Sequence, residues 1–189
     1  MQSMTSAPAT SLVWIGTAAI CLLAAGCGND NSADKAPMAP VYSVEGNALV
    51  LEGGTYEGED GTASLLISTS GDLNGDAAID EASILVLNSR GSGVFYYLNV
   101  LLNDGNGGLE LAGEAFIGDR IKFDFMDIYG PGAVSRLTAG VPVHPDDYGQ
   151  VVVGYSIHNR GQAYAETPEI YITRNWKVEG EKLVAVEQY

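Results

Sequence analysis

The feature that most constrains the fold is a series of short apolar runs, separated by turns rich in glycine, asparagine and aspartate, that begins at Val41. Ser83–Leu87 and Val94–Leu102 are nearly continuous apolar segments, which predicts central strands buried on both faces. Asn88–Gly93 and Asn103–Gly108 are turn signals. No long segment of helical period follows the N-terminal region. We therefore expect one mainly β domain at 41–189, an antiparallel sandwich or curved sheet.

Other segments are also predicted as strands because apolar side chains alternate along them. Ile121, Phe123 and Phe125 are expected to share one strand face, and Val151, Val153 and Tyr155 another. Further strands are expected at Ala48–Leu51 and Ala63–Ser68, in the Ile170–Val178 stretch and from Leu183. A short helix can form near Asp146–Tyr148 or within Gly161–Glu166.

Charge is strongly unbalanced, with 24 acidic residues against 9 basic ones and a net charge of -15. Such a surface repels nucleic-acid phosphates and anionic lipid headgroups, so we expect neither as a partner. It favours cations. The alternative is an acidic surface that is simply solvated.

The N-terminal region contains an uncharged apolar run, Leu12–Ala25, which is too short to span a bilayer but suits the core of an export signal. It ends in Leu23-Ala24-Ala25-Gly26-Cys27, a string that resembles the bacterial lipobox. The resemblance implies cleavage after residue 26 and acylation of Cys27, which would anchor the chain to a membrane. Two features depart from that pattern: residues 1–11 contain no Lys or Arg, and Ala24 stands where leucine is usual. An ordinary secretory signal or a simple N-terminal anchor is the alternative.

The only cysteines are Cys21 and Cys27, so a mature chain with a lipidated Cys27 has no disulfide. Small, polar and proline residues dominate positions 27–40, which predicts a disordered tether between the lipid and the domain. Gly28 rather than aspartate follows the cysteine, which favours the outer membrane. We therefore expect a cell-envelope protein that faces the periplasm or the exterior.

One motif resembles a metal site. Oxygen-bearing side chains recur at Asp72, Asn74, Asp76 and Asp80, and the carbonyl of Ala78 lies between the last two. This spacing lets a tight loop wrap Ca²⁺, and Ca²⁺ would offset the repulsion between the carboxylates. The alternative is a cluster of Asx turns that bond nearby backbone N–H groups.

The loop is not a complete EF-hand, because Ala77 replaces the usual glycine and Ser83 replaces the usual closing glutamate. No bidentate carboxylate therefore closes the shell unless Glu81 turns into the loop. If calcium binds, we expect weak affinity, with a Kd of about 10⁻⁴–10⁻³ M as in extracellular modules.

Four segments occur in a fixed order along the chain: the loop Gly71–Asp76, the run Ser83–Leu87, the strand Gly91–Leu98 and the motif Ala115–Ile121. In these segments the sequence resembles a family of small bacterial exported proteins and lipoproteins without known activity. Members of that family carry a GDLNGDG-type loop, a GGSG-F-x-YL strand and an LGDRI motif. Where that family usually carries glycine after the last aspartate of the loop motif, this chain has Ala77.

Two functions follow from these patterns. The first is a non-enzymatic binding or structural module of the envelope whose protein or glycan partner the sequence does not identify. The second is a periplasmic hydrolase of glycan or peptide that uses Asp, Glu or His. His144 and Asp146 can form a base and its orienter, but no matched nucleophile motif accompanies them. Other polar or aromatic residues have structural interpretations: an ion pair for Asp119 and Arg120, a surface position for His158, and core packing for Tyr96, Tyr97 and Tyr155.

Overall fold

The structure is a computed structural model that describes residues 39–91, 93–180 and 182–186, and it is mainly β and antiparallel, as the sequence predicts. The signal, Cys27 and most of the tether lie outside the described residues. No helix among those residues is long and apolar enough to cross a membrane. The elements are β1 (Val41–Val44), β2 (Asn47–Val50), β3 (Thr55–Glu57), β4 (Gly61–Gly71), β5 (Asp80–Ser89), β6 (Val94–Asn103), β7 (Leu109–Asp119), β8 (Lys122–Ile128), the 3₁₀ turn η1 (Pro145–Asp147), β9 (Val151–Ile157), β10 (Ile170–Glu179) and β11 (Lys182–Val186).

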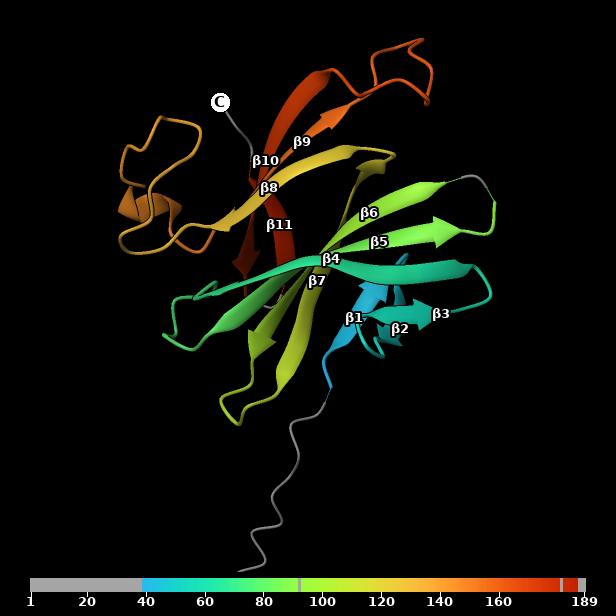
Figure 1. Cartoon of the computed structure of the whole chain (residues 1–189). Helices are drawn as coiled ribbons and strands as arrows, with labels where there is room; N and C mark the ends of the chain where they lie inside the picture. Colours follow the sequence, from blue (N-terminus) through green and yellow to red (C-terminus); the bar gives the residue numbers. More distant parts are fainter. Residues whose placement is uncertain (1–38, 92, 181, 187–189) are drawn as a thin grey trace, which may run out of the picture. The chain divides into compact units, whose positions relative to one another are not determined.

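A five-stranded sheet in the order β3-β4-β5-β6-β7 forms the centre of the domain (Figure 1). The two apolar runs predicted as central strands are β5 and β6, and they occupy its interior. Their side chains are buried on both faces: Ile84 and Leu98 belong to one core cluster, Leu85 and Tyr97 to another. The prediction for these two strands is confirmed.

One face of this sheet packs against a four-stranded sheet in the order β11-β10-β9-β8. The shared core contains Ile84 and Leu98 from the first sheet, and Val153, Tyr155 and Trp176 from the second. As predicted, Val151, Val153 and Tyr155 share the inner face of β9. Two packed antiparallel sheets make the domain a sandwich.

The other face of the five-stranded sheet is covered by the β1–β2 hairpin. Tyr42, Val44 and Leu49 of the hairpin are buried against Leu85 and Tyr97. Glu45 and Gly46 form its turn with φ of 55° and 76°, the left-handed pair that a tight hairpin turn requires. The hairpin thus adds a third, smaller layer.

β-Bulges account for the main differences from the sequence predictions. The β8–β9 register shifts between Phe123 and Phe125, so these two side chains do not share a face: Phe123 packs in the inter-sheet core, whereas Phe125 lies in an outer cluster with Val152. The expected grouping of Ile121, Phe123 and Phe125 is wrong for Phe125, because a bulge inserts one residue and reverses the alternation. β7 was not expected as a strand, and its pairing with β6 shifts register at two places.

Candidate functional site

The predicted calcium loop, Asp72–Asp80, connects β4 to β5 and is held by turns of its own. The Asp72 carboxylate accepts hydrogen bonds from the N–H groups of Gly75 at 2.6 Å and Ala77 at 3.1 Å. Asp76 accepts from the N–H of Ala78 at 2.7 Å and from the Asn74 amide at 2.9 Å. The two bonds to Asp76 lower its pKa because they favour the ionised carboxylate, and the backbone bond from Ala78 has the larger effect. They match the Asx-turn interpretation.

The last acidic residue of the motif points elsewhere. Asp80 is fully buried, and its carboxylate accepts from the N–H of Leu73 at 2.8 Å and of Asn103 at 2.9 Å. It therefore ties the start of the loop to the end of β6. Glu81 does not turn into the loop, since its carboxylate accepts from Tyr42 at 3.1 Å and from Ser83 at 2.5 Å.

The described residues include no group of three or more His, Cys, Asp or Glu side chains placed to hold a metal ion. Carboxylate oxygens that accept an N–H bond still have lone pairs for a second partner. Calcium binding at Asp72, Asn74, Asp76, Ala78 and Asp80 stays a prediction.

Ala77 adopts φ of 67°, the left-handed region that favours glycine. The resemblance in sequence predicts glycine here, and glycine adopts this φ without strain.

The two histidines lie in separate loops, and each contacts groups close to it in the sequence. His144 caps the 3₁₀ turn at Pro145–Asp147 by accepting from the N–H of Asp146, and its ring lies 3.4 Å from the Asp146 carboxylate. Both side chains are exposed, at 70% and 89%. His158 bonds the carbonyl of Glu166 at 3.0 Å and packs edge-on against Tyr164.

Asp119 and Arg120 form the structural ion pair that the sequence predicts, with Arg120 Nη1 2.7 Å from Asp119 Oδ2. Asp119 also accepts from the N–H of Val94 at 3.1 Å, and the Arg120 guanidinium lies 4.5 Å from the centre of the Tyr164 ring. The pair fixes the β7–β8 corner and holds the loop that carries Tyr164.

The tyrosines predicted to be core residues are packed in the cores. Tyr155 is buried between the sheets and Tyr96 packs against the same cluster, while Tyr97 faces the hairpin. Burial raises the pKa of each. The Glu45 carboxylate accepts a hydrogen bond from the Tyr97 hydroxyl at 3.0 Å and raises the pKa of Tyr97 further.

One concave surface of the domain was not predicted from the sequence. Two adjoining cavities of about 360 and 560 Å³ lie between β2 and β3, and both are lined by Ala48, Leu49 and Tyr56. We call this surface the β2–β3 groove. Leu49, Ala63 and Leu87 supply apolar side chains from the hairpin cluster.

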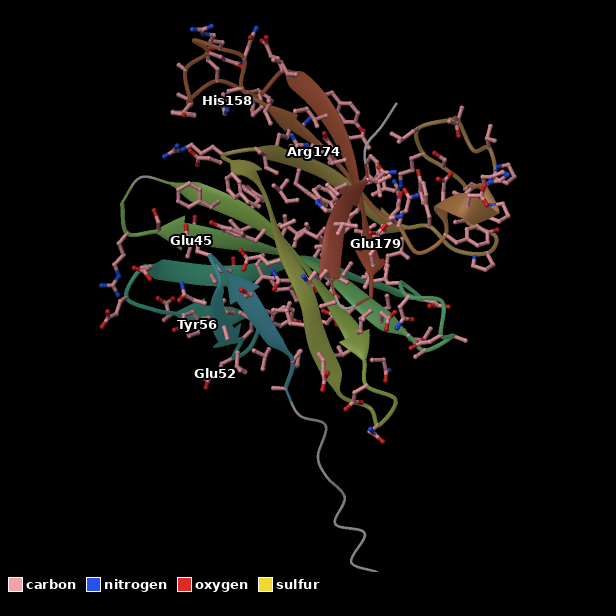
Figure 2. The ribbon with its side chains drawn as sticks, turned by 180° about the vertical axis from the view of Figure 1, so that it is seen from behind. Glu45, Glu52, Tyr56, His158, Arg174 and Glu179 are labelled. Atoms are coloured by element: carbon pink, nitrogen blue, oxygen red, sulfur yellow. The ribbon has the colours of Figure 1, made fainter. Side chains whose placement is uncertain are left out.

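The β2–β3 groove is acidic. Within the part of the chain that the structure describes, its lining includes no Lys, Arg or His side chain. The Arg90 guanidinium, which lies near the groove, donates a hydrogen bond to the Gly58 carbonyl at 3.1 Å. Figure 2 labels Glu45, Glu52 and Tyr56 on this side of the domain. The carboxylates of the lining are Glu45, Glu59 and Asp60 in the first cavity and Glu52 and Glu57 in the second.

Sequence reasoning missed this groove because it depends on contacts that the sequence does not encode locally. The hairpin is positioned by Asn99 and Glu114, which are 56 and 71 residues from Ser43. The available signal was the density of acidic residues from Glu45 to Asp60.

Comparison with known proteins supplies no further information on the site: no family model, no curated protein and no solved structure matches the chain. The resemblance to small exported proteins stays a prediction carried by the sequence motifs.

Proposed function

We propose that the chain is a bacterial envelope lipoprotein, anchored through lipid on Cys27, whose β-sandwich is a non-enzymatic binding module. The observation that carries the proposal is the string Leu23–Cys27 at the end of an apolar run. A small-residue stretch before a cysteine suits a lipoprotein signal peptidase, and the thiol then carries the acyl chains. More than one acyl chain gives stable anchoring.

The arrangement of the described domain supports a binding role over hydrolysis. The His144–Asp146 pair lies on an exposed turn, and both side chains are already part of that turn. The β2–β3 groove contains carboxylates and a tyrosine on an apolar base. Concave sites with apolar walls and a few polar groups are typical of ligand binding.

In this proposal the residues up to 26 are removed as the signal, 27–40 serve as the tether, and 41–189 form the module. Gly28 after the cysteine favours the outer membrane, and the acidic surface disfavours nucleic acid as a partner. The loop at Asp72–Asp80 can add stability by binding Ca²⁺, a separate hypothesis with its own test in the Discussion.

Lipidation is tested by expressing the full chain in a bacterium and analysing the membrane fraction. We expect mass spectrometry to find a mature chain that begins at Cys27 and carries acyl chains, and detergent-phase partitioning to follow it. Cys27→Ala should give an uncleaved or soluble product. Cys21→Ala is the matched control, because its thiol leaves with the signal, and it should behave as wild type. A bare Cys27 thiol in the mature chain would contradict the proposal.

A further inference from the structure

The backbone of the β1–β2 hairpin presents two edges whose hydrogen-bonding groups follow from its register. Val44 and Asn47 flank the two-residue turn, so they form a hydrogen-bonded pair. Such pairs alternate along an antiparallel ladder. The next pair, Ser43 and Ala48, therefore directs its N–H and C=O groups outward, away from the hairpin. The same holds for Val41 and Val50.

The β1 edge is closed by side chains of the central sheet. Asn99, which is fully buried, accepts from the N–H of Ser43 at 2.6 Å and donates to its carbonyl at 2.9 Å. Glu114 accepts from the Ser43 hydroxyl and from the N–H groups of Glu45 and Gly46. These bonds confirm the direction that the register assigns to Ser43.

The β2 edge has no such closure among the described residues, where β2 pairs with β1 alone. The N–H and C=O groups of Ala48 and Val50 point from this edge toward the β2–β3 groove, which both residues line. A strand edge of this kind is a template for an incoming strand.

The opposite wall of the groove offers similar groups. Gly58 donates to the carbonyl of Gly61, and Leu65 to that of Gly54, which fixes the hydrogen-bonded pairs between β3 and β4. By alternation Glu57 directs its N–H and C=O away from β4. At the other end, Glu52 and Thr55 bond each other's backbones at 2.7 and 3.2 Å and close the groove.

Charge selects the kind of strand that fits. The groove is rimmed by Glu45, Glu52, Glu57, Glu59 and Asp60, and none of the described basic side chains lines it. An acidic or neutral segment would gain nothing from this rim, whereas lysine or arginine side chains would meet opposite charges. Apolar side chains on the alternate face would meet Leu49 and Tyr56.

We propose that the β2–β3 groove binds an extended, lysine- or arginine-rich segment of a partner protein, which adds as a strand to the β2 edge at Ala48 and Val50. The proposal deepens the proposed function, since it names the partner class of the binding module. Main-chain bonds to the edge select an extended polypeptide, and the carboxylates select its charge. A small polycation would use the charges and leave the edge unpaired.

The test uses the full chain and a labelled probe peptide of sequence Lys-Thr-Lys-Val-Lys-Thr-Lys-Val, with fluorescence anisotropy as the readout. The matched probe has glutamate in place of lysine. A second matched probe carries N-methyl groups along its backbone, which remove the donors needed for strand pairing. We expect saturable binding of the lysine peptide and none of either matched probe. Equal binding of the lysine and N-methyl peptides would overturn strand addition.

Protein variants separate local from overall charge. Glu59→Lys with Asp60→Lys should weaken binding about tenfold or more, because two attractive charges become repulsive at the site. Glu110→Lys with Glu169→Lys makes the same change in net charge at exposed positions outside the groove lining. This control should bind within about twofold of wild type. If both double variants weakened peptide binding equally, binding would depend on net charge, and the assignment of the site to the groove would be overturned.

Amide hydrogen exchange locates the contact independently of affinity. Peptide binding should slow exchange at Ala48 and Val50, whose N–H groups become paired, while unaffected exchange at both would overturn the assignment. Spermine that displaces the peptide and binds as tightly would assign the groove to small polycations and also overturn it. Lipidation at Cys27 is measured separately, so failure of the groove and failure of the anchor are distinguishable.

Discussion

At the scale of single residues, Ala77 shows how one side chain can oppose the loop that contains it. Its φ of 67° costs an L-residue about 1–2 kcal/mol, and glycine avoids this cost while losing about 0.5–1 kcal/mol of chain entropy. We expect Ala77→Gly to raise the free energy of unfolding by about 0.5–1 kcal/mol, measured by urea denaturation. The matched change Ala78→Gly, at a residue with ordinary φ, should lower it instead. A destabilising Ala77→Gly would contradict the loop geometry.

The environment of the Tyr42 hydroxyl indicates that the folded state loses stability in alkali. Burial, then the Glu81 carboxylate, raises its pKa from 10.0 to about 12 in the folded state. The fold therefore binds this proton more tightly than the unfolded chain does. Its contribution is complete below pH 10 and is lost as the pH rises through 12. We expect the denaturation midpoint to fall across this window, with Tyr97 adding to the loss because its pKa is also raised.

In the variant Tyr42→Phe the denaturation midpoint should fall less steeply in alkali, but it should still fall because Tyr97 remains. At neutral pH the substitution should cost about 1.5–3 kcal/mol, the contribution of the lost hydrogen bond to the Glu81 carboxylate. Tyr171→Phe, at an exposed side chain, is the control and should keep the wild-type profile. An unchanged alkaline profile in Tyr42→Phe would refute the assignment.

At the scale of elements, the β1–β2 hairpin depends on one buried amide. Asn99→Ala would leave the N–H and C=O of Ser43 without their partners. Each unmet buried group costs about 1–3 kcal/mol, so we expect a loss of about 2–5 kcal/mol in denaturant unfolding. Asn88→Ala, at an exposed position of β5, should change stability by less than about 0.5 kcal/mol. A loss below about 1 kcal/mol in Asn99→Ala would mean that the hairpin is not held in this way.

The elements also show where sequence reasoning succeeds and where it stops. β5 and β6 were predictable because an unbroken apolar run suits a strand buried on both faces. β7 was not, since Gly113, Glu114 and Gly118 interrupt its apolar pattern and its pairing with β6 shifts register twice. The face of Phe125 was assigned wrongly because a bulge leaves no mark in the alternation of polar and apolar residues.

The site was less predictable than the fold for a related reason. The turn bonds of Asp72 and Asp76 are local, and their spacing in the sequence revealed them. The groove is made by the approach of a hairpin to a sheet edge, and its position follows from long-range bonds such as that between Ser43 and Asn99. Local patterns indicate which residues are acidic but not which strand edge they surround.

At the scale of the whole molecule, a net charge of -15 makes stability depend on salt. Charges of one sign repel in the compact state, and the screening length falls from about 30 Å at 0.01 M to about 10 Å at 0.1 M ionic strength. We expect the thermal midpoint to rise as NaCl is added over this range. MgCl₂ at equal ionic strength should give a similar rise if screening is the cause.

Calcium chloride at the same ionic strength separates screening from a bound ion. A site with a Kd of about 10⁻⁴–10⁻³ M would add about 1.4–2.7 kcal/mol at 10 mM Ca²⁺, because only the folded loop binds the ion. The calcium hypothesis therefore predicts a CaCl₂ curve above the MgCl₂ curve, and Asp76→Ala should remove the difference while keeping the response to NaCl. Coincident curves for the two divalent salts, with no heat in calorimetric titration, would eliminate calcium and leave Asp72–Asp80 as a self-bonded turn. That outcome would also leave the acidic groove unaffected, since its carboxylates lie on β2, β3 and the adjoining turns rather than on this loop.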